Sequence, residues 1–521
     1  MSETVEKKQI DPVTFFGSIA IITIVCTYLI VNIERGTAMV NKIFGFLTGP
    51  LGWSYEWYAM FMVGVLVYFI LGKYGDVRLG EGKPEFKTMS WIGMLFTAGV
   101  GSSITYWGTI EFFYYYKSPP FGAEPFSVEA ARWASAYGLF HWTVGNAMYA
   151  VMGVVFAFMF FVQKKDVLRP SMACKPIIGK AADGLVGKMI DIFFILGLIA
   201  GIATTLGLAT PLISEIISQL FGFKRSSGMD IFIVMSLTGL IALTVYLGLH
   251  KGIQVASDFR VYLTLGLLLF VLLAGSTGYM LNTFTEGLGI MFQNFFEMSF
   301  YTDAQGKSGF PQGWTIFYWA WWVAFSIQMG IYIARISKGR TIREVAVGSM
   351  VSLSCGCWCF FLTLGNYSMD VFQKGIVPLK ELMANEGAPA AIAALWASLP
   401  MGKVTMFLLM FVTFLGAVTS LSSSGFTLAV VTTKKITGEE EPARWTRVFW
   451  SLALGVAAIT LMLLGGLRPL QTASIVGSFP MMFITLIIIA GFFKELRKVY
   501  ASQKEPSRVE LPHGEPGIDM S

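Results

Sequence analysis

Residues 311–335 read PQGWTIFYWAWWVAFSIQMGIYIAR, and residues 317–322 within them, FYWAWW, contain five aromatic side chains, three of them tryptophan. The only charged residue of this apolar segment is Arg335, at its end. A helix of this length can cross a hydrocarbon core of about 30 Å. The segment therefore predicts a transmembrane helix with an unusual load of rings in its middle.

Similar apolar runs recur along the whole chain. Of its 521 residues, 55% are hydrophobic and 13% are charged, and the mean hydropathy is +0.64, whereas about a quarter of a soluble domain is charged. We expect an all-α polytopic membrane protein with twelve transmembrane helices. The predicted spans are 12–33, 51–72, 88–116, 135–162, 189–220, 229–249, 259–282, 311–335, 342–366, 404–430, 446–465 and 469–493.

The distribution of basic residues predicts the orientation of these spans. If the N-terminus lies inside, 27 of the 38 Lys and Arg residues fall on the inner side and 11 on the outer side. Basic residues concentrate in cytoplasmic loops, so we expect a multi-pass protein of the inner (plasma) membrane with both termini in the cytoplasm. The net charge of +6 then needs no nucleic-acid partner.

Glycine-rich stretches interrupt three of the spans. Residues 97–103, 201–207 and 419–425 fall in the third, fifth and tenth spans, and loosened backbone in a membrane is expected against protein or a water-filled cavity. Spans 3–7 and 8–12 can form two inverted five-helix repeats after two lead-in helices. The expected units are 1–87 (cytoplasmic N-terminus and lead-in helices), 88–283 (first repeat), 284–310 (amphipathic surface helix and connector), 311–495 (second repeat) and 496–521 (short cytoplasmic tail).

The rings of the eighth span form one stripe. The stripe runs from Trp314 to Met329, roughly 22 Å at 1.5 Å per residue. An interfacial aromatic belt would stay at the headgroups, and packing faces between membrane helices favour small residues. Aromatic faces attract cations, and a quaternary ammonium group offers no N–H, so a cage of rings suits it. We expect such a cage to combine rings of spans 3, 4 and 8, namely Tyr114, Trp142, Trp321 and Trp322.

Three stretches resemble the betaine/carnitine/choline transporter family. They are PQGWTIFYWAWWVAFSIQMGIYIARISKGRTIRE (311–344), YWGTIEFFYYYKSPPFG (106–122) and KGIQVASDFRVYL (251–263). The similarity covers about residues 10–495 and looks greatest to the carnitine/γ-butyrobetaine exchangers. It implies a leucine-transporter-type fold of two inverted five-helix repeats preceded by two helices, usually assembled as a homotrimer in the bilayer.

The resemblance also assigns candidate site residues. The substrate-binding residues that it implies are Tyr114, Trp142, Trp321, Trp322, Gln328 and Met329, and those of an outer, transient site are Trp314 and Tyr318.

Coupling is expected to involve Arg260 and Met329, because in the exchangers an arginine and a methionine at these positions replace two sodium ions. A fixed guanidinium can neutralise the same carbonyl and hydroxyl oxygens that a sodium ion would bridge. Glu111 is the expected partner of Arg260, since an intramembrane carboxylate rarely stays unpaired. The alternative is that Arg260 snorkels at the inner end of span 7.

The sequence departs from the exchangers in several places. Residues 141–147 read HWTVGNA where the exchangers have HWGPLPW, so Ala147 replaces a ring, and Phe325 stands where they have tyrosine. Residues 98–104, AGVGSSI, are closer to sodium-coupled members. Thr419 and Ser420 carry hydroxyls that are ion ligands in those relatives; here they can hold sodium or accept hydrogen bonds from Arg260.

We therefore expect a secondary transporter of trimethylammonium compounds, with sodium-independent exchange of L-carnitine for γ-butyrobetaine by alternating access. The alternatives are a sodium- or proton-coupled symporter of glycine betaine or choline and, from a different class, an intramembrane enzyme or a channel. No cofactor and no metal are expected, because CGCWC at 355–359 has no second ligand cluster. His141 is expected to be a hydrogen-bonded packing residue, and Asp191 to pair with a nearby basic group.

Overall fold

The computed structural model describes residues 9–101, 103–165, 168–246, 250–434, 436 and 440–504, with the backbone alone for 250–254 and 502–504. Residues 1–8 of the expected cytoplasmic N-terminus and 505–521 of the expected tail lie outside this part of the chain.

Helices make up almost all of the described chain, which contains two isolated β-bridges and no β-strand. In chain order the α-helices are α1 (Pro12–Val31), α2 (Ile33–Thr48), α3 (Gly52–Leu71), α4 (Thr88–Gly99), α5 (Ile104–Lys117), α6 (Val128–Ala157), α7 (Pro170–Ala173), α8 (Lys175–Ile178), α9 (Leu185–Phe221), α10 (Ser227–Tyr246), α11 (His250–Ala274), α12 (Thr277–Gln293), α13 (Phe295–Ser299), α14 (Phe310–Gly313), α15 (Thr315–Arg335), α16 (Ile342–Phe360), α17 (Asn366–Gln373), α18 (Leu379–Asn385), α19 (Ala388–Ala397), α20 (Gly402–Val431), α21 (Arg444–Leu464) and α22 (Arg468–Lys504).

Eleven helical stretches of the described chain are long and apolar enough to cross a membrane. They correspond to every predicted span except the third. That span is formed by α4 and α5, which are separated by residues 100–103, so the expected break in it is confirmed. Each of these two helices is too short to cross a membrane alone. The described chain therefore contains eleven uninterrupted helical stretches of sufficient length, whereas the sequence predicts twelve spans.

The other two glycine-rich stretches do not break their helices, and that expectation is wrong. Both α9 and α20 run through them without interruption. In α20 the hydroxyls of Thr419, Ser423 and Thr427 donate to carbonyl oxygens three or four residues back, at 3.0 to 3.1 Å. These local bonds satisfy polar side chains within the helix, so clustered serines do not require loosened backbone.

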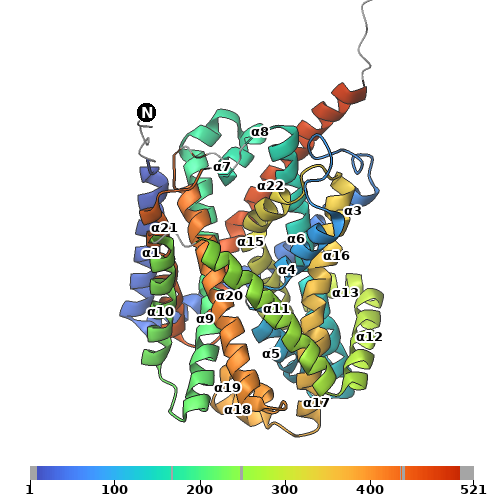
Figure 1. Ribbon diagram of the computed structural model, residues 1–521, viewed down its shortest axis with the longest axis vertical. Coiled ribbons are helices and arrows are strands. Elements are labelled where there is room, and N and C mark those ends of the chain that lie inside the picture. Colours follow the sequence, from blue (N-terminus) through green and yellow to red (C-terminus); the bar gives the residue numbers. More distant parts are fainter. Residues whose placement is uncertain are drawn as a thin grey trace, which may run out of the picture.

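The amphipathic helix, which is predicted within 284–310, also differs in extent from the prediction. The seventh span ends at Ala274, and α12 begins at Thr277, so the surface helix takes in residues assigned to the end of that span. In Figure 1, α12 stands at the flank of the bundle rather than inside it.

Two corresponding helices of the expected repeats end alike. One turn of π-helix, Phe158–Val162, continues α6, and another, Phe361–Gly365, continues α16. Such turns are rare and usually occupy functional positions. The start of α1 and the end of α22 lie at the same end of the molecule, opposite α17, α18 and α19 (Figure 1).

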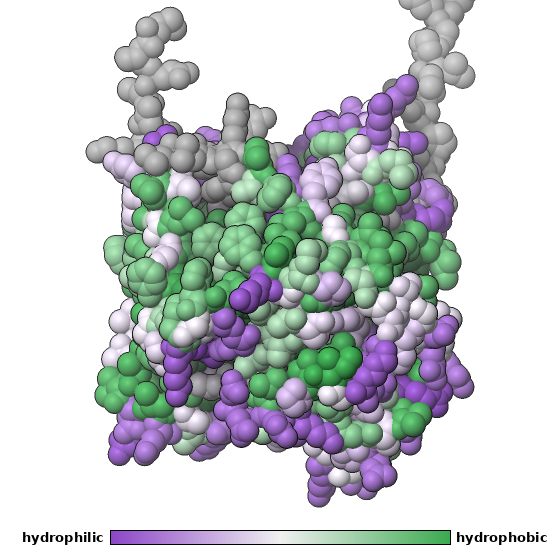
Figure 2. Space-filling model, turned by 60° about the horizontal axis from the view of Figure 1, so that its bottom comes forward, coloured by the Kyte–Doolittle hydropathy of each residue, from purple (hydrophilic) through white to green (hydrophobic). Residues whose placement is uncertain are grey.

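The flank of the molecule is apolar. Figure 2 shows green hydrophobic surface across the body of the molecule, with purple polar surface gathered toward its two ends. Large hydrophobic side chains on this exterior include Val31, Leu71, Phe232 and Leu273. Contiguous apolar surface of this size marks contact with lipid or protein.

The segment before α1 is tied to the end of α20. The amide of Asp11 donates to the Thr432 carbonyl at 2.8 Å, and the amide of Lys434 donates to the Gln9 carbonyl at 2.9 Å. We call residues 9–11 and 432–434 the N-terminal strap. It fixes the end of α20 to the beginning of α1.

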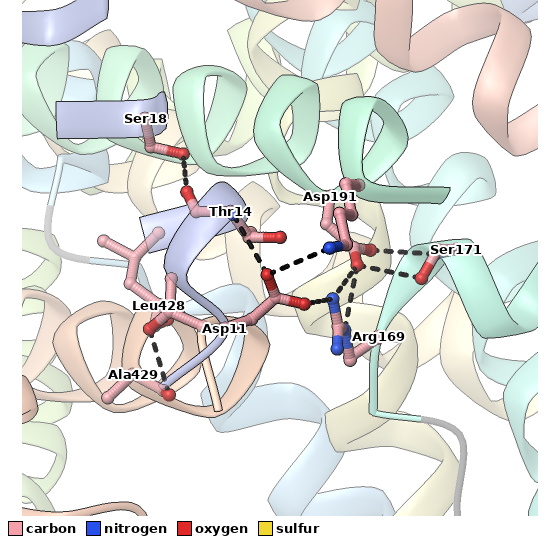
Figure 3. Close-up of polar contacts among 10 residues, drawn as sticks. Asp11, Thr14, Ser18, Arg169, Ser171, Asp191, Leu428 and Ala429 are labelled. Atoms are coloured by element: carbon pink, nitrogen blue, oxygen red, sulfur yellow. Dashed lines mark hydrogen bonds and ion pairs between the residues drawn. The ribbon is translucent and has the colours of Figure 1, made fainter. Parts of the chain in front are cut away.

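Ion pairs reinforce this attachment. Arg169 lies between two carboxylates, 3.3 Å from Asp11 and 2.7 Å from the fully buried Asp191 (Figure 3). The expected pairing of Asp191 is thus confirmed. Burial raises the pKa of Asp11, but the Thr14 amide and the charges of Arg169 and Lys188 outweigh burial and hold it below its ordinary value. At any pH above the ordinary pKa of an aspartate, these contacts contribute their full stabilisation to the fold. The stabilisation is lost as the pH falls through the lowered pKa that Asp11 has in the folded protein.

The Arg169→Ala substitution is expected to destabilise the protein by about 3–5 kcal/mol, because it leaves the buried Asp191 carboxylate without its ion partner. The measurement is the midpoint of thermal unfolding in detergent. Lys175→Ala is the control, since it removes an ion pair with Asp183 in which both side chains are about half exposed, worth about 0–1 kcal/mol. Equal midpoints for the two variants would contradict the role of Arg169.

Candidate functional site

A cavity of about 170 Å³ lies against the middle of α15. Its walls come from α15, α6, α9, α16, α20, the end of α4 and the break between α4 and α5. The lining residues are Ala98, Gly99, Gly101, Ser103, Trp142, Asn146, Tyr149, Ile202, Thr205, Trp321, Trp322, Phe325, Gln328, Met329, Cys357, Ser420, Ser423 and Ser424. The loosened backbone of span 3 therefore borders a cavity, as expected for irregular structure at membrane depth.

Three indoles form a corner of this cavity. The plane of Trp142 makes angles of 86° with Trp322 and 79° with Trp321, and Trp321 and Trp322 are at 90°. Their centroids are 4.8 to 6.4 Å apart. Three mutually near-perpendicular ring planes present π surface from three directions.

Each of these indoles is held by its N–H group. Trp142 Nε1 donates to Glu111 at 3.0 Å, Trp321 Nε1 to the Gly201 carbonyl at 3.3 Å, and Trp322 Nε1 to Asn146 Oδ1 at 3.4 Å. A buried indole N–H normally finds such a partner. Because the three polar edges are bound to protein, the rings are fixed.

The cavity carries no fixed charge. None of its lining residues within the described chain is Asp, Glu, Lys, Arg or His. Its polar groups are neutral hydroxyls and amides, including Thr205, Gln328 and Ser420. Such a site suits a ligand of zero net charge or a diffuse cation, which needs no counter-charge at contact distance.

Glu111 lies behind the indole wall and does not contact Arg260, so the expected pairing of these two residues is wrong. Its carboxylate is fully buried and accepts hydrogen bonds from Trp142, from the Tyr115 hydroxyl at 2.7 Å, and from the Tyr318 hydroxyl. Three donors satisfy the carboxylate without a basic partner. Its structural effect is to tie the cavity wall to the neighbouring aromatic layer.

Arg260 binds the helix break instead. Its side chain is 7% exposed, and Nη2 donates to the Val100 carbonyl at 2.9 Å. Val100 directly follows α4, where the carbonyl groups at the end of a helix have no intrahelical partner. The snorkelling alternative does not describe this buried side chain.

The candidate outer site is filled by its own rings. Trp314 lies 4.9 Å from Tyr114 and 5.8 Å from Trp107 between ring centroids, and Tyr318 is stacked on His141 at 4.8 Å. Neither Trp314 nor Tyr318 lines the cavity. They form a packed aromatic layer on the side away from the N-terminal strap.

Tyr114 belongs to this layer, so the structure does not bring the four expected cage rings together. It contacts Trp314 and is absent from the cavity wall, where Tyr149 and Phe325 accompany the three indoles. The ring nitrogens of His141 lie 2.9 Å from the Tyr115 hydroxyl and 3.1 Å from the Thr315 hydroxyl. His141 is thus the hydrogen-bonded packing residue that was expected.

On the opposite side, the cavity adjoins a second, larger cavity of about 610 Å³. The two share Gln328, Ser420 and Ser423, and the larger one is also lined by Thr419 and Arg335 at the end of α15. Weak contacts at 3.4 to 3.5 Å join Gln328 to Ser423 and Ser424 at the junction. The larger cavity therefore adjoins the central one on the side of Val430, close to the N-terminal strap, whereas the aromatic layer around Trp314 lies at the opposite end of α15.

Asn146 and Tyr149 are cavity residues that the sequence analysis missed. They follow Trp142 by four and seven residues on α6, and so share its helical face. That spacing is the signal that would have identified them. Thr205 had no comparable signal, because its position depends on how α9 packs.

The model of the BCCT family, the betaine/carnitine/choline family of transporters, matches residues 13–501. The match covers nearly the whole described chain, including every element that lines the cavity. The chain therefore belongs to the betaine/carnitine/choline transporter family and is a multi-pass membrane transporter of compounds of that kind.

Proposed function

We propose that this transporter exchanges trimethylammonium carboxylates, with L-carnitine and γ-butyrobetaine as its substrates, and that exchange needs no sodium gradient. The ammonium head would lie in the indole corner formed by Trp142, Trp321 and Trp322.

The observation that carries this proposal is the indole corner in an uncharged cavity. Cation–π contacts contribute up to about 2 kcal/mol each where the cation is desolvated, and the ring angles let one methylated nitrogen meet several π faces. A primary ammonium would also need hydrogen-bond acceptors for its three N–H groups. A trimethylammonium group needs none.

The rest of the cavity supports a substrate that carries its own negative charge. Among the described residues that line the cavity, the groups available to a carboxylate are neutral donors such as Gln328, Thr205 and Ser103. A zwitterion enters without net charge, which avoids the cost of moving an isolated charge into the membrane. Met329 and Phe325 supply apolar contact for the chain between its two ends.

Arg260 supports sodium independence. Its guanidinium donates to a carbonyl at the helix break, a group of the kind that coordinates a bound cation in broken membrane helices. A covalently attached cation at this place cannot be released with the substrate, so it would remove one requirement for an ion gradient. The competing mode is sodium symport, in which Thr419 and Ser420 would bind the ion.

The two ends of the site support alternating access. The aromatic layer closes one side, and the larger cavity opens toward the N-terminal strap, which would be the cytoplasmic side by the distribution of basic residues. Transport would then require the layer around Trp314 and Tyr318 to separate while the junction at Gln328 closes.

Counterflow in proteoliposomes tests the mode of transport. Vesicles loaded with γ-butyrobetaine and placed in sodium-free potassium buffer are expected to take up labelled L-carnitine, whereas empty vesicles take up little. Glycine betaine and choline serve as alternative internal substrates. Uptake that requires sodium and proceeds into empty vesicles would contradict exchange and identify a symporter.

Trp321→Ala and Trp322→Ala are each expected to weaken trimethylammonium binding roughly 30-fold, the equivalent of losing about 2 kcal/mol of cation–π attraction. Equilibrium binding of labelled substrate to purified protein measures the loss. Trp445→Ala is the matched control, because this indole on α21 is 53% exposed and outside the cavity.

A neutral analogue of the substrate tests how much the positive charge contributes to binding. Replacing the trimethylammonium nitrogen by carbon keeps the shape of the head and removes its attraction to π faces. The analogue is expected to compete poorly with substrate for the wild-type protein. Equal competition would show that the rings act only as apolar walls.

Arg260→Ala is expected to abolish sodium-free counterflow or to make it depend on sodium, because the carbonyl oxygen at the break loses its cation. The measurement is counterflow with and without sodium at constant ionic strength. Arg132→Ala is the control, since that arginine forms an exposed ion pair with Glu286. Unchanged sodium-free exchange by Arg260→Ala would contradict the role of the guanidinium.

A further inference from the structure

We infer that Gly145 and Asn146 of α6 are positioning residues that seat Trp322 and thereby set the size of the ammonium head that the cavity accepts. This inference rests on the proposed function, because it concerns which methylated cations that site selects.

Gly145 allows the indole to lie directly on the backbone of α6. A Cβ atom at this position would lie only 2.4 Å from two ring carbons of Trp322 and 2.5 Å from its nitrogen. Carbon atoms in favourable contact are about 3.5–4.0 Å apart, so any larger residue at 145 has to displace the ring by about 1 Å or more. The ring occupies space that only glycine leaves free.

Asn146 fixes the orientation of the same ring. Its Oδ1 accepts from Trp322 Nε1 at 3.4 Å, while its Nδ2 donates to the Trp142 carbonyl at 2.6 Å. The amide thus joins the indole of Trp322 to the backbone of α6 at Trp142, and Asn146 is 2% exposed. A longer or apolar side chain would lose both bonds.

The other neighbours of Trp322 leave one direction for displacement. Trp142 lies edge-on at 4.8 Å, and Tyr149 lies nearly parallel at 6.2 Å and 24°. Trp321 stands perpendicular to it at 6.1 Å, and Tyr318 lies 5.7 Å away at 58°. A ring moved away from Gly145 therefore moves into the cavity and reduces the space for the ammonium head. Compounds with a fully methylated nitrogen would lose the most binding affinity, and compounds with fewer methyl groups on the nitrogen would lose less.

The experiment compares binding of γ-butyrobetaine and its dimethyl analogue, 4-(dimethylamino)butanoate, to wild type and to Gly145→Ala. The variant is expected to lose at least about tenfold in affinity for the trimethyl compound, the scale of one mis-sized methyl group in a packed pocket. Affinity for the dimethyl compound is expected to change by less than about threefold. The ratio of trimethyl to dimethyl affinity, which is the selectivity, therefore falls. A loss that is equal for both compounds would overturn the inference.

A double-variant cycle tests whether Gly145 acts through the indole. The smaller ring of Trp322→Phe relieves the crowding, so adding Gly145→Ala to this background is expected to have little further effect on selectivity. Additive effects of the two changes would show that Gly145 acts elsewhere and would overturn the inference. Gly239→Ala on α10 is the control, because nothing lies within 4 Å of the added methyl group.

Asn146→Leu provides a second variant with no added backbone crowding. It keeps the branching of the side chain but removes the amide, which accepts from Trp322 and donates to the Trp142 carbonyl, the Ser354 hydroxyl and the Cys357 sulfur. It is expected to lower the trimethyl-to-dimethyl ratio in the same direction. An unchanged ratio would show that the amide does not hold the ring. If wild type binds no methylated ammonium compound, the proposed function itself fails, and that result is distinct from an altered or unaltered ratio among variants.

Discussion

A polar group buried at membrane depth has to find its partner within the protein, and this constraint organises the site. Water is not available there to satisfy donors and acceptors. Glu111 is the clearest example, since a carboxylate with no exposed surface is bound by three donors from aromatic side chains. At the helix break, the guanidinium of Arg260 donates a hydrogen bond to the Val100 carbonyl, so each of these buried polar groups has a partner in the protein. These bonds fix both the walls of the cavity and its irregular backbone.

The hydrogen bonds of Glu111 also connect the indole corner to the aromatic layer. Trp142 belongs to the indole corner, whereas Tyr318 belongs to the aromatic layer that closes the cavity, and both donate to the same carboxylate. Movement of the layer would therefore alter the support of one cage ring. A ligand that holds Trp142 in place would therefore be linked through Glu111 to Tyr318 of the aromatic layer.

The sequence predicted the fold well because transmembrane spans are recognised by length and hydropathy, which are local properties. It also placed Trp142, Trp321, Trp322, Gln328 and Met329 on one cavity. It failed where the outcome depends on packing. The glycines of α9 receive neighbouring side chains instead of breaking the helix, as where Gly201 meets the ring of Phe325. Likewise, Tyr115 follows Glu111 by four residues on α5, but its other two partners come from α6 and α15, and no spacing in the sequence reveals those two.

The N-terminal strap has a consequence for how motion is detected. Main-chain pairing between residues 9–11 and 432–434 makes the beginning of the first lead-in helix move with the end of α20, although α1 itself contributes nothing to the cavity. A spectroscopic probe at the accessible start of α1 would then report rearrangement of a cavity-lining helix without altering any residue that contacts ligand. For the same reason, a deletion that removes residues 9–11 is expected to loosen the end of α20.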